Sequence, residues 1–195
     1  HNIVSAGSSA GTGGFISLAS GGAGAKSSGG VVVKTVDAGV NGFTGALEFT
    51  SGATSSGSSG KIEFSTGSAT TGRSGSVVLS GGTATGHIGG HLIMATGEST
   101  DQTGGAISLS SGMGNAKSSG SLVLLTANAG TAGTSGHLTF STGTTSAGTS
   151  GYAVLETGSA TLGKGGHVIV SVGSGNTFGG GDVALTAGET SAATS

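Results

Sequence analysis

Apolar and polar residues alternate in short stretches that recur along the whole chain. Residues 60–74 show the pattern: a glycine opens the unit, Ile62 and Phe64 alternate with polar residues, and small residues lead to the next glycine, Gly75. Alternation with a period of two is typical of a half-buried β-strand, and flanking Gly, Ser and Thr favour turns. Each unit is therefore expected to be a strand, a turn and a return.

The opening glycine recurs every 15 residues, with two steps of 16. Apolar residues stand two and four positions after it, and Ala153 is the one small residue among them. In the two longer units, Asp37-Ala38-Gly39 and Asn128-Ala129-Gly130 are expected to form a one-residue β-bulge. The opening glycines are Gly14, Gly29, Gly45, Gly60, Gly75, Gly90, Gly105, Gly120, Gly136, Gly151, Gly166 and Gly181.

A unit with one strong apolar pair cannot bury that pair alone, so the units are expected to stack on their neighbours. The expected fold is all-β: a flattened, two-sheeted β-solenoid of about thirteen coils of 15–16 residues, spaced by about 4.8 Å. Small residues in the second half of each unit favour the flat form. Residues 1–195 are expected to be a single array, either an excerpt of a longer repeat protein or a protomer that stacks head to tail.

A longer period of 91 residues, or six coils, lies above the short one. Ile16-Ser17-Leu18 returns as Ile107-Ser108-Leu109, and the two longer units share the same offset. This six-coil super-repeat has two explanations. It records duplication of a six-coil block, or it serves a partner that contacts every sixth coil.

Residues three positions after the opening glycine are expected to point away from the core, and half of them are β-branched aliphatics. Such residues suit strands for local reasons, but a solvated face needs none of them. The alternative to local preference is a lateral interface with another rod or sheet layer. This outer aliphatic row consists of Val32, Val78, Ile93, Val123, Val154 and Ile169.

Two carboxylates occupy the same outward position. Glu48 and Glu63 would lie one strand spacing apart, which is an unfavourable like-charge pair. Lys34 and Lys61 are on the same face, so an ion-pair cluster is expected rather than a carboxylate dyad.

A second outward row, eight and ten positions after the opening glycine, is rich in hydroxyl groups. We name it the Ser/Thr row: Ser68, Thr70, Thr83, Thr85, Thr144, Ser146, Ser159 and Thr161. Flat threonine arrays of this kind resemble the ice-binding surfaces of several antifreeze proteins, which implies ordering of water. Glu98, Met113 and Glu189 interrupt the row. A hydrated or O-glycosylated face is the other interpretation.

Composition narrows the class of protein. The 195 residues are 33% hydrophobic, 4% aromatic and 7% charged, with 45 glycines, no proline and a net charge of −2. These values argue against a thick globular core, against collagen and against a highly charged disordered tail. Six scattered basic residues make no patch for nucleic acid.

Signals of catalysis or metal binding are weak. His91, His137 and His167 share one position of the unit but are separated by two or three coils, too far to bind one ion. The run Gly179-Gly180-Gly181-Asp182 is similar to the calcium-binding nonapeptide of bacterial β-rolls, but that motif works by repetition and is not repeated here. No phosphate-binding loop occurs. An enzyme, a cofactor and a metal site are not expected.

The recurring unit G-x-Φ-x-Φ-x-[ST]-G, in which Φ is apolar, resembles the Gly/Ser/Thr-rich tandem arrays of secreted proteins in diatoms and related algae. The resemblance covers the whole chain, implies an extracellular or cell-surface location and brings no known activity. Cysteine, an N-x-[ST] glycosylation sequon and an apolar span long enough for a membrane are all absent from the sequence.

These observations predict a structural, non-catalytic building block of an extracellular fibre or surface coat. It would assemble by stacking of coils and by lateral packing of the outer aliphatic row. The expected partners are other copies of the chain and, with them, glycans, but neither nucleic acid nor a membrane. The alternative is an ice- or surface-binding protein that uses the Ser/Thr row.

Overall fold

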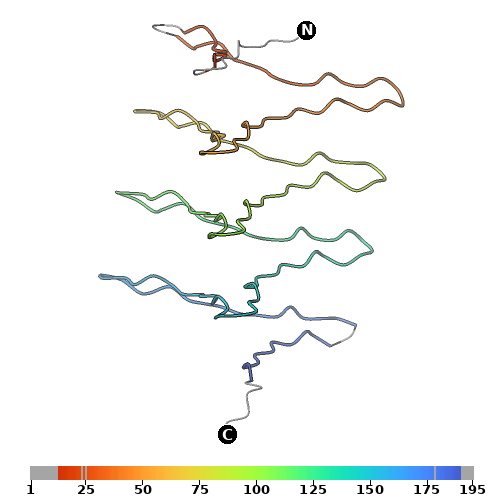
Figure 1. The fold of residues 1–195 in the computed structure, drawn as a ribbon. Coiled ribbons are helices and arrows are strands. Elements are labelled where there is room, and N and C mark those ends of the chain that lie inside the picture. Colours follow the sequence, from red (N-terminus) through yellow and green to blue (C-terminus); the bar gives the residue numbers. More distant parts are fainter. Residues whose placement is uncertain (1–12, 23, 25, 178, 190–195) are drawn as a thin grey trace. The chain divides into compact units, whose positions relative to one another are not determined.

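The computed structural model describes residues 13–22, 24, 26–177 and 179–189, and these residues form no helix and no strand. The chain divides into two larger units, His1–Gly97 (the first unit) and Glu98–Ser195 (the second unit), and each contains several of the 15- or 16-residue repeats. Within each unit the backbone makes a series of narrow hairpin arms, one for each 15- or 16-residue repeat (Figure 1). The arms are extended coil joined by bends.

Each arm reverses direction at a bend that begins ten or eleven positions after its opening glycine. Residues 55–57, 70–72 and 85–87 are such bends in the first unit, and residues 146–148 and 161–163 are equivalent bends in the second. Hydroxyl side chains stabilise some of these bends locally, because Thr and Ser can bond the backbone two or three residues on. In one arm Thr54 Oγ1 accepts a hydrogen bond from the Ser56 amide at 3.3 Å, and in another Ser99 Oγ accepts one from the Gln102 amide at 2.9 Å.

The two limbs of an arm touch at one recurring place, which we call the clasp. There the opening glycine of one unit lies against the residue six positions after the preceding opening glycine. A Cβ atom on Gly166 would lie 3.3 Å from Cβ of Thr157, and one on Gly75 would lie 3.4 Å from Cγ2 of Thr66. The pairs are Gly29 with Ser20, Gly45 with Thr35, Gly60 with Ser51, Gly75 with Thr66, Gly90 with Gly81, Gly120 with Ser111, Gly136 with Thr126, Gly151 with Thr142, Gly166 with Thr157 and Gly181 with Val172.

Hydrogen bonds close some of the clasps. The Gly90 amide donates to the Gly82 carbonyl at 2.9 Å, and the Gly120 amide donates to the Gly112 carbonyl at 2.9 Å. In the clasp at Gly29 the Ser20 hydroxyl adds a bond to the Gly29 carbonyl at 2.8 Å. A side chain on the opening glycine would press on the opposite limb at the tightest clasps, those of Gly90, Gly166 and Gly181, whereas at the other clasps it would make ordinary van der Waals contact.

In the longer unit that begins at Gly29, the extra residue lies in a tight turn at the arm's reversal. The Gly42 amide donates to the Gly39 carbonyl at 3.2 Å, and Asn41 has a φ of 64°. Asparagine tolerates this left-handed conformation better than most residues with a side chain. The expected β-bulges at Asp37-Ala38-Gly39 and Asn128-Ala129-Gly130 are wrong, because the described residues contain no strand in which a bulge could lie.

The predicted all-β fold, the flattened two-sheeted β-solenoid of stacked coils, is also wrong. The described residues form no strand and no sheet, and their backbone hydrogen bonds close arms and turns instead of joining successive apolar segments. The physical reason is that each repeat folds back on itself after its apolar segment. The small residues that follow this segment bend the chain, and the clasp holds the two limbs together. Local bonds of this kind compete with a sheet ladder.

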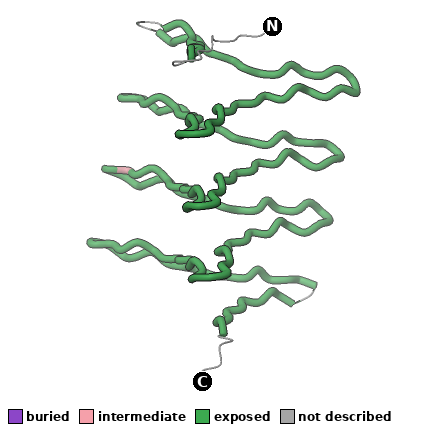
Figure 2. The backbone as a smooth tube through the Cα atoms, viewed as in Figure 1, coloured by how far each residue is buried: buried purple, intermediate pink, exposed green. Residues whose placement is uncertain are grey.

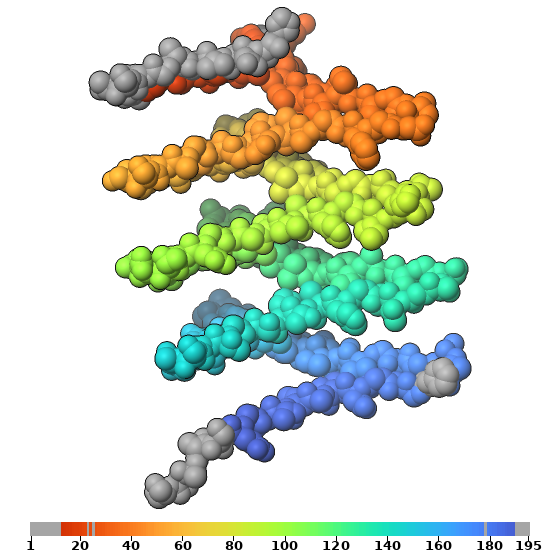
Figure 3. Space-filling view, turned by 45° about the vertical axis from the view of Figure 1, so that its right-hand side comes forward, coloured from red at the N-terminus to blue at the C-terminus, as the bar shows by residue number. Residues whose placement is uncertain are grey.

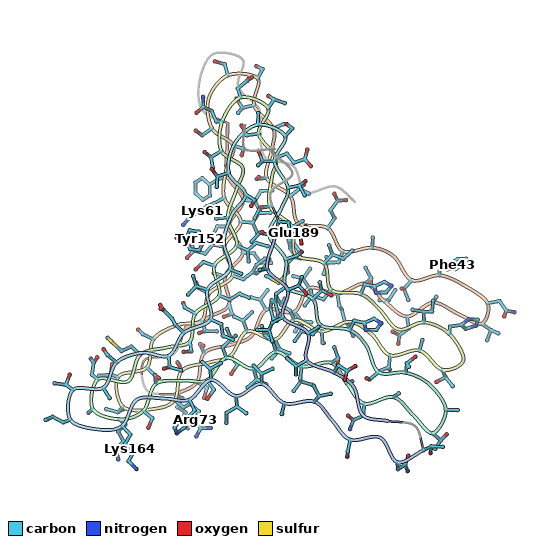
Figure 4. All side chains as sticks on the ribbon, turned by 90° about the horizontal axis from the view of Figure 1, so that it is seen from below. Phe43, Lys61, Arg73, Tyr152, Lys164 and Glu189 are labelled. Atoms are coloured by element: carbon cyan, nitrogen blue, oxygen red, sulfur yellow. The ribbon has the colours of Figure 1, made fainter. Side chains whose placement is uncertain are left out.

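No side chain among the described residues is buried (Figure 2). Every described residue is exposed except Gly114, which is half-buried. The described arms are narrow in the space-filling view (Figure 3). The side chain of Phe43, for example, is fully exposed, so its arm does not cover it (Figure 4).

The alternation read from the sequence is nevertheless visible in the exposed fractions of neighbouring side chains. Val77, two positions after its opening glycine, is 53% exposed, whereas Val78 is 79% exposed. Leu92 and Ile93 differ in the same way, with 59% and 83%. Two faces exist along each apolar segment, and both of them are open.

Candidate assembly surface

All six residues of the outer aliphatic row are exposed. Val32, Val78 and Ile93 lie in the first unit, and the other three members lie in the second. Each lies in a different repeat, and successive repeats are not joined into a sheet among the described residues. The structure thus leaves these side chains available for contact with another molecule.

Each residue of the outer row is also the middle of three consecutive apolar residues. A period of two assigns the first and third of these residues to one face and the middle residue to the other, so the set of three was not predicted as one feature. The signal was present, since positions two, three and four are all apolar in these units. We call them the apolar triplets: residues 31–33, 77–79, 92–94, 122–124, 153–155 and 168–170.

The backbone of the triplets is unpaired. Among the residues that the structure describes, no amide or carbonyl group of a triplet makes a hydrogen bond to protein. Extended backbone with free amides and carbonyls on both sides can pair with another extended chain. The triplets therefore offer open edges as well as open apolar faces.

Within the described ranges, apolar side chains of adjacent repeats come close in two places. The rings of Phe49 and Phe64, four positions after successive opening glycines, are 6.2 Å apart at 83°, an edge-to-face pair. In the second unit Phe140, Ala153, Val154 and Leu155 line an open apolar hollow of about 460 Å³. Alanine stands at position 153, where the other repeats carry a larger apolar residue.

Among the described residues, one salt bridge forms on the outward face where Glu48 and Glu63 were expected. Lys61 Nζ and Glu63 Oε2 make a salt bridge between two exposed side chains. The predicted relief of Glu63 by Lys61 is confirmed. Among the described residues no ion pair joins Lys34 or Glu48 to this pair, so the larger predicted cluster is wrong. Pairs exposed to this extent contribute little to stability.

The Ser/Thr row lies on the arms, and its residues are exposed. None of their hydroxyl groups makes a hydrogen bond to protein among the described residues, so they are free to bind water or to carry a modification. The row is divided among separate arms and does not lie on a sheet. Its members are Ser68, Thr70, Thr83, Thr85, Thr144, Ser146, Ser159 and Thr161.

The histidines and the single calcium-like run form no site of several ligands. In the described part of the chain, no three His, Asp or Glu side chains lie close enough together to hold a metal ion. Arg73 and Lys164 project from their arms (Figure 4) and pair with no acidic group in the described ranges.

Within the described residues no helical segment has the length and hydropathy that crossing a bilayer requires. No protein-family model, no curated protein and no solved structure matches this chain. The likeness to algal tandem arrays therefore stays a prediction.

Proposed function

We propose that this chain is a structural, non-catalytic building block of an extracellular fibre or surface coat. Copies of the chain associate and cover one another's outer aliphatic row. The extracellular location rests on the Gly/Ser/Thr-rich repeat and on its resemblance to secreted arrays. The role in a fibre or coat rests on exposure of the apolar residues.

One observation supports the proposal above all others: the repeats carry regularly spaced large apolar side chains, and none of those described is buried. Covering a Val, Leu, Ile or Phe side chain stabilises a protein by about 1.5–3 kcal/mol. The single chain gains little of this, because its described large apolar side chains are all exposed and the two limbs of each arm meet mainly at small residues of the clasp. Association with further molecules would gain the rest.

The charge distribution favours association over repulsion. Charged residues are 7% of the chain and the net charge is −2, so few charges oppose the approach of two copies. Soluble monomers usually carry a much higher share of mixed surface charge. Many exposed large apolar side chains on such a background favour an interaction site.

The unpaired hydroxyl groups of the Ser/Thr row are compatible with a hydrated or glycosylated outer surface of the same fibre. They are also what an ice-binding surface would need. That alternative is less well supported, because ordering an ice lattice needs hydroxyl groups at fixed spacing and these lie on separate arms.

Electron microscopy of the isolated chain tests the proposal. Filaments or sheets that grow with protein concentration are the expected result. Single particles at every concentration, together with thermal hysteresis and faceted ice crystals, would contradict the structural role and favour ice binding.

A further inference from the structure

We propose that the six apolar triplets pair as β-strands between copies of the chain, parallel and in register. The inference rests on the proposed function and specifies how the copies would join. The sheet would thus be formed between molecules, whereas the single chain has none among its described residues.

The side chains of the triplets suit a strand that is covered on both faces. In a strand, neighbouring side chains point to opposite faces, so three consecutive apolar residues make both faces apolar. Residues 122–124, Leu-Val-Leu, and residues 168–170, Val-Ile-Val, are of this kind, and all six side chains are at least half exposed. Runs of this type are typical of strands covered on both faces.

The backbone of the triplets also suits pairing with another strand. The triplets contain no proline and no glycine, and their amides and carbonyls make no hydrogen bond to protein among the described residues. An added strand would satisfy these groups and align the side chains at the same time. Short segments with high β-propensity, low charge and no proline pair most readily in this way.

The spacing of the triplets favours a second copy in parallel register as the partner. Their central residues are 46, 15, 30, 31 and 15 residues apart along the chain. This series differs when read backwards, so an antiparallel copy cannot place all six triplets against triplets at once. A parallel copy in register can, and six linked contacts bind far more strongly than one.

A parallel, in-register arrangement brings identical residues of two copies together, so any charged residue would face a like charge. The triplets contain no charged residue. Lys61 and Glu63 lie in a repeat without a triplet, and their opposite charges pair with each other. Electrostatic repulsion along the stack is therefore confined to the remaining scattered charged residues.

The single tyrosine provides a direct test. Tyr152 comes immediately before the triplet at 153–155, and it is the one tyrosine in the sequence, so full-length chain grown with 1-¹³C tyrosine carries a single label. Solid-state NMR recoupling on the assembled protein measures the distance between labels on neighbouring copies. The expected distance is about 4.8 Å, one strand spacing. A nearest label beyond about 9.6 Å, two strand spacings, would overturn the inference.

Two variants at one position separate backbone pairing from side-chain packing. Val154→Pro removes an amide that makes no hydrogen bond in the structure, whereas Val154→Thr keeps the amide and the branched shape. The proline variant is expected to lengthen the Tyr152 label distance beyond one strand spacing, and the threonine variant is expected to preserve it. Equal label distances in the two variants would contradict pairing through the backbone.

The outcomes distinguish this inference from the function on which it rests. Filaments with a long label distance would leave the structural role intact and show that the copies do not pair through in-register triplets. A failure to assemble under any condition would overturn both. Filaments with a one-strand label distance that proline lengthens would support both.

Discussion

A Cβ atom on Gly81 would lie 2.9 Å from the carbonyl carbon of Gly90, nine residues later, and closer still to its oxygen. Both residues are glycine, so the two limbs of this arm approach through backbone alone. The Gly90 amide closes the arm by donating to the Gly82 carbonyl at 2.9 Å. Similar clasps recur along the chain and set the geometry of the arms.

Gly81→Ala should therefore open its arm. The new methyl group would press on backbone that cannot move aside, at a cost of about 1–3 kcal/mol. Hydrogen exchange measured by mass spectrometry should show the Gly90 amide exchanging about fivefold faster or more. Gly82→Ala is the matched control, because a Cβ atom there meets nothing within 4 Å. Equal exchange rates in the two variants would show that the clasp is not sterically closed.

Replacing Asn41 tests the tight turn in the longer unit. A β-branched side chain is strained at its φ of 64°, whereas glycine adopts this conformation readily. Asn41→Val should weaken the bond from the Gly42 amide to the Gly39 carbonyl by about 1 kcal/mol, and Asn41→Gly should retain it. Amide exchange at Gly42 measures the difference. Faster exchange in the glycine variant than in the valine variant would contradict the turn.

The alternation of the apolar segments could be recognised from the sequence because it depends on neighbouring residues. Val77 and Val78 differ in exposure in the direction that a period of two predicts. Alternation defines faces but does not define which strand lies alongside, and register needs either a buried face or a turn that sets it. Among the described residues no face is buried, and the turns join the two limbs of one arm and do not align successive apolar segments, so the extrapolation from a repeated unit to stacked coils failed.

The role of the opening glycine could not be predicted from its period alone. Gly166 was recognised as the start of a unit, but its contact with Thr157 depends on the arm folding back on itself. Small residues such as those at 158–161 permit a bend at many places, and composition does not specify which. The candidate row at Val32 and its equivalents was identified from spacing, while the binding role of that row stays a prediction.

Charge placed on the outer aliphatic row should block association. Val78→Lys with Ile169→Lys removes two apolar contacts of at least about 1.5 kcal/mol each and puts charges in their place. The concentration needed for assembly should rise tenfold or more for about each 1.4 kcal/mol lost. Light scattering across a concentration series measures this threshold.

Lysines placed on the Ser/Thr row control for the change in net charge. Thr70→Lys with Thr161→Lys also adds two positive charges, so either double variant changes the net charge from −2 to 0. This control should assemble close to the unsubstituted threshold. If both double variants lose assembly equally, charge alone is responsible and the outer row is not the interface.

Salt should strengthen assembly. Apolar contacts are not screened by ions, and sulfate favours burial of apolar surface because it is excluded from protein surfaces. Adding sodium sulfate should lower the threshold concentration in turbidity or light-scattering measurements. A threshold that rises steadily with salt would indicate that charge pairs between copies, and not apolar contacts, hold the assembly together.

Sedimentation velocity on a dilution series of the full chain tests most directly whether copies cover one another's apolar residues. The single chain has a mass of 17.8 kDa. Above a threshold concentration the boundary should shift to species many times heavier, and dilution should return it to the single chain. One species of 17.8 kDa at every concentration would contradict self-association as the function of the exposed apolar rows.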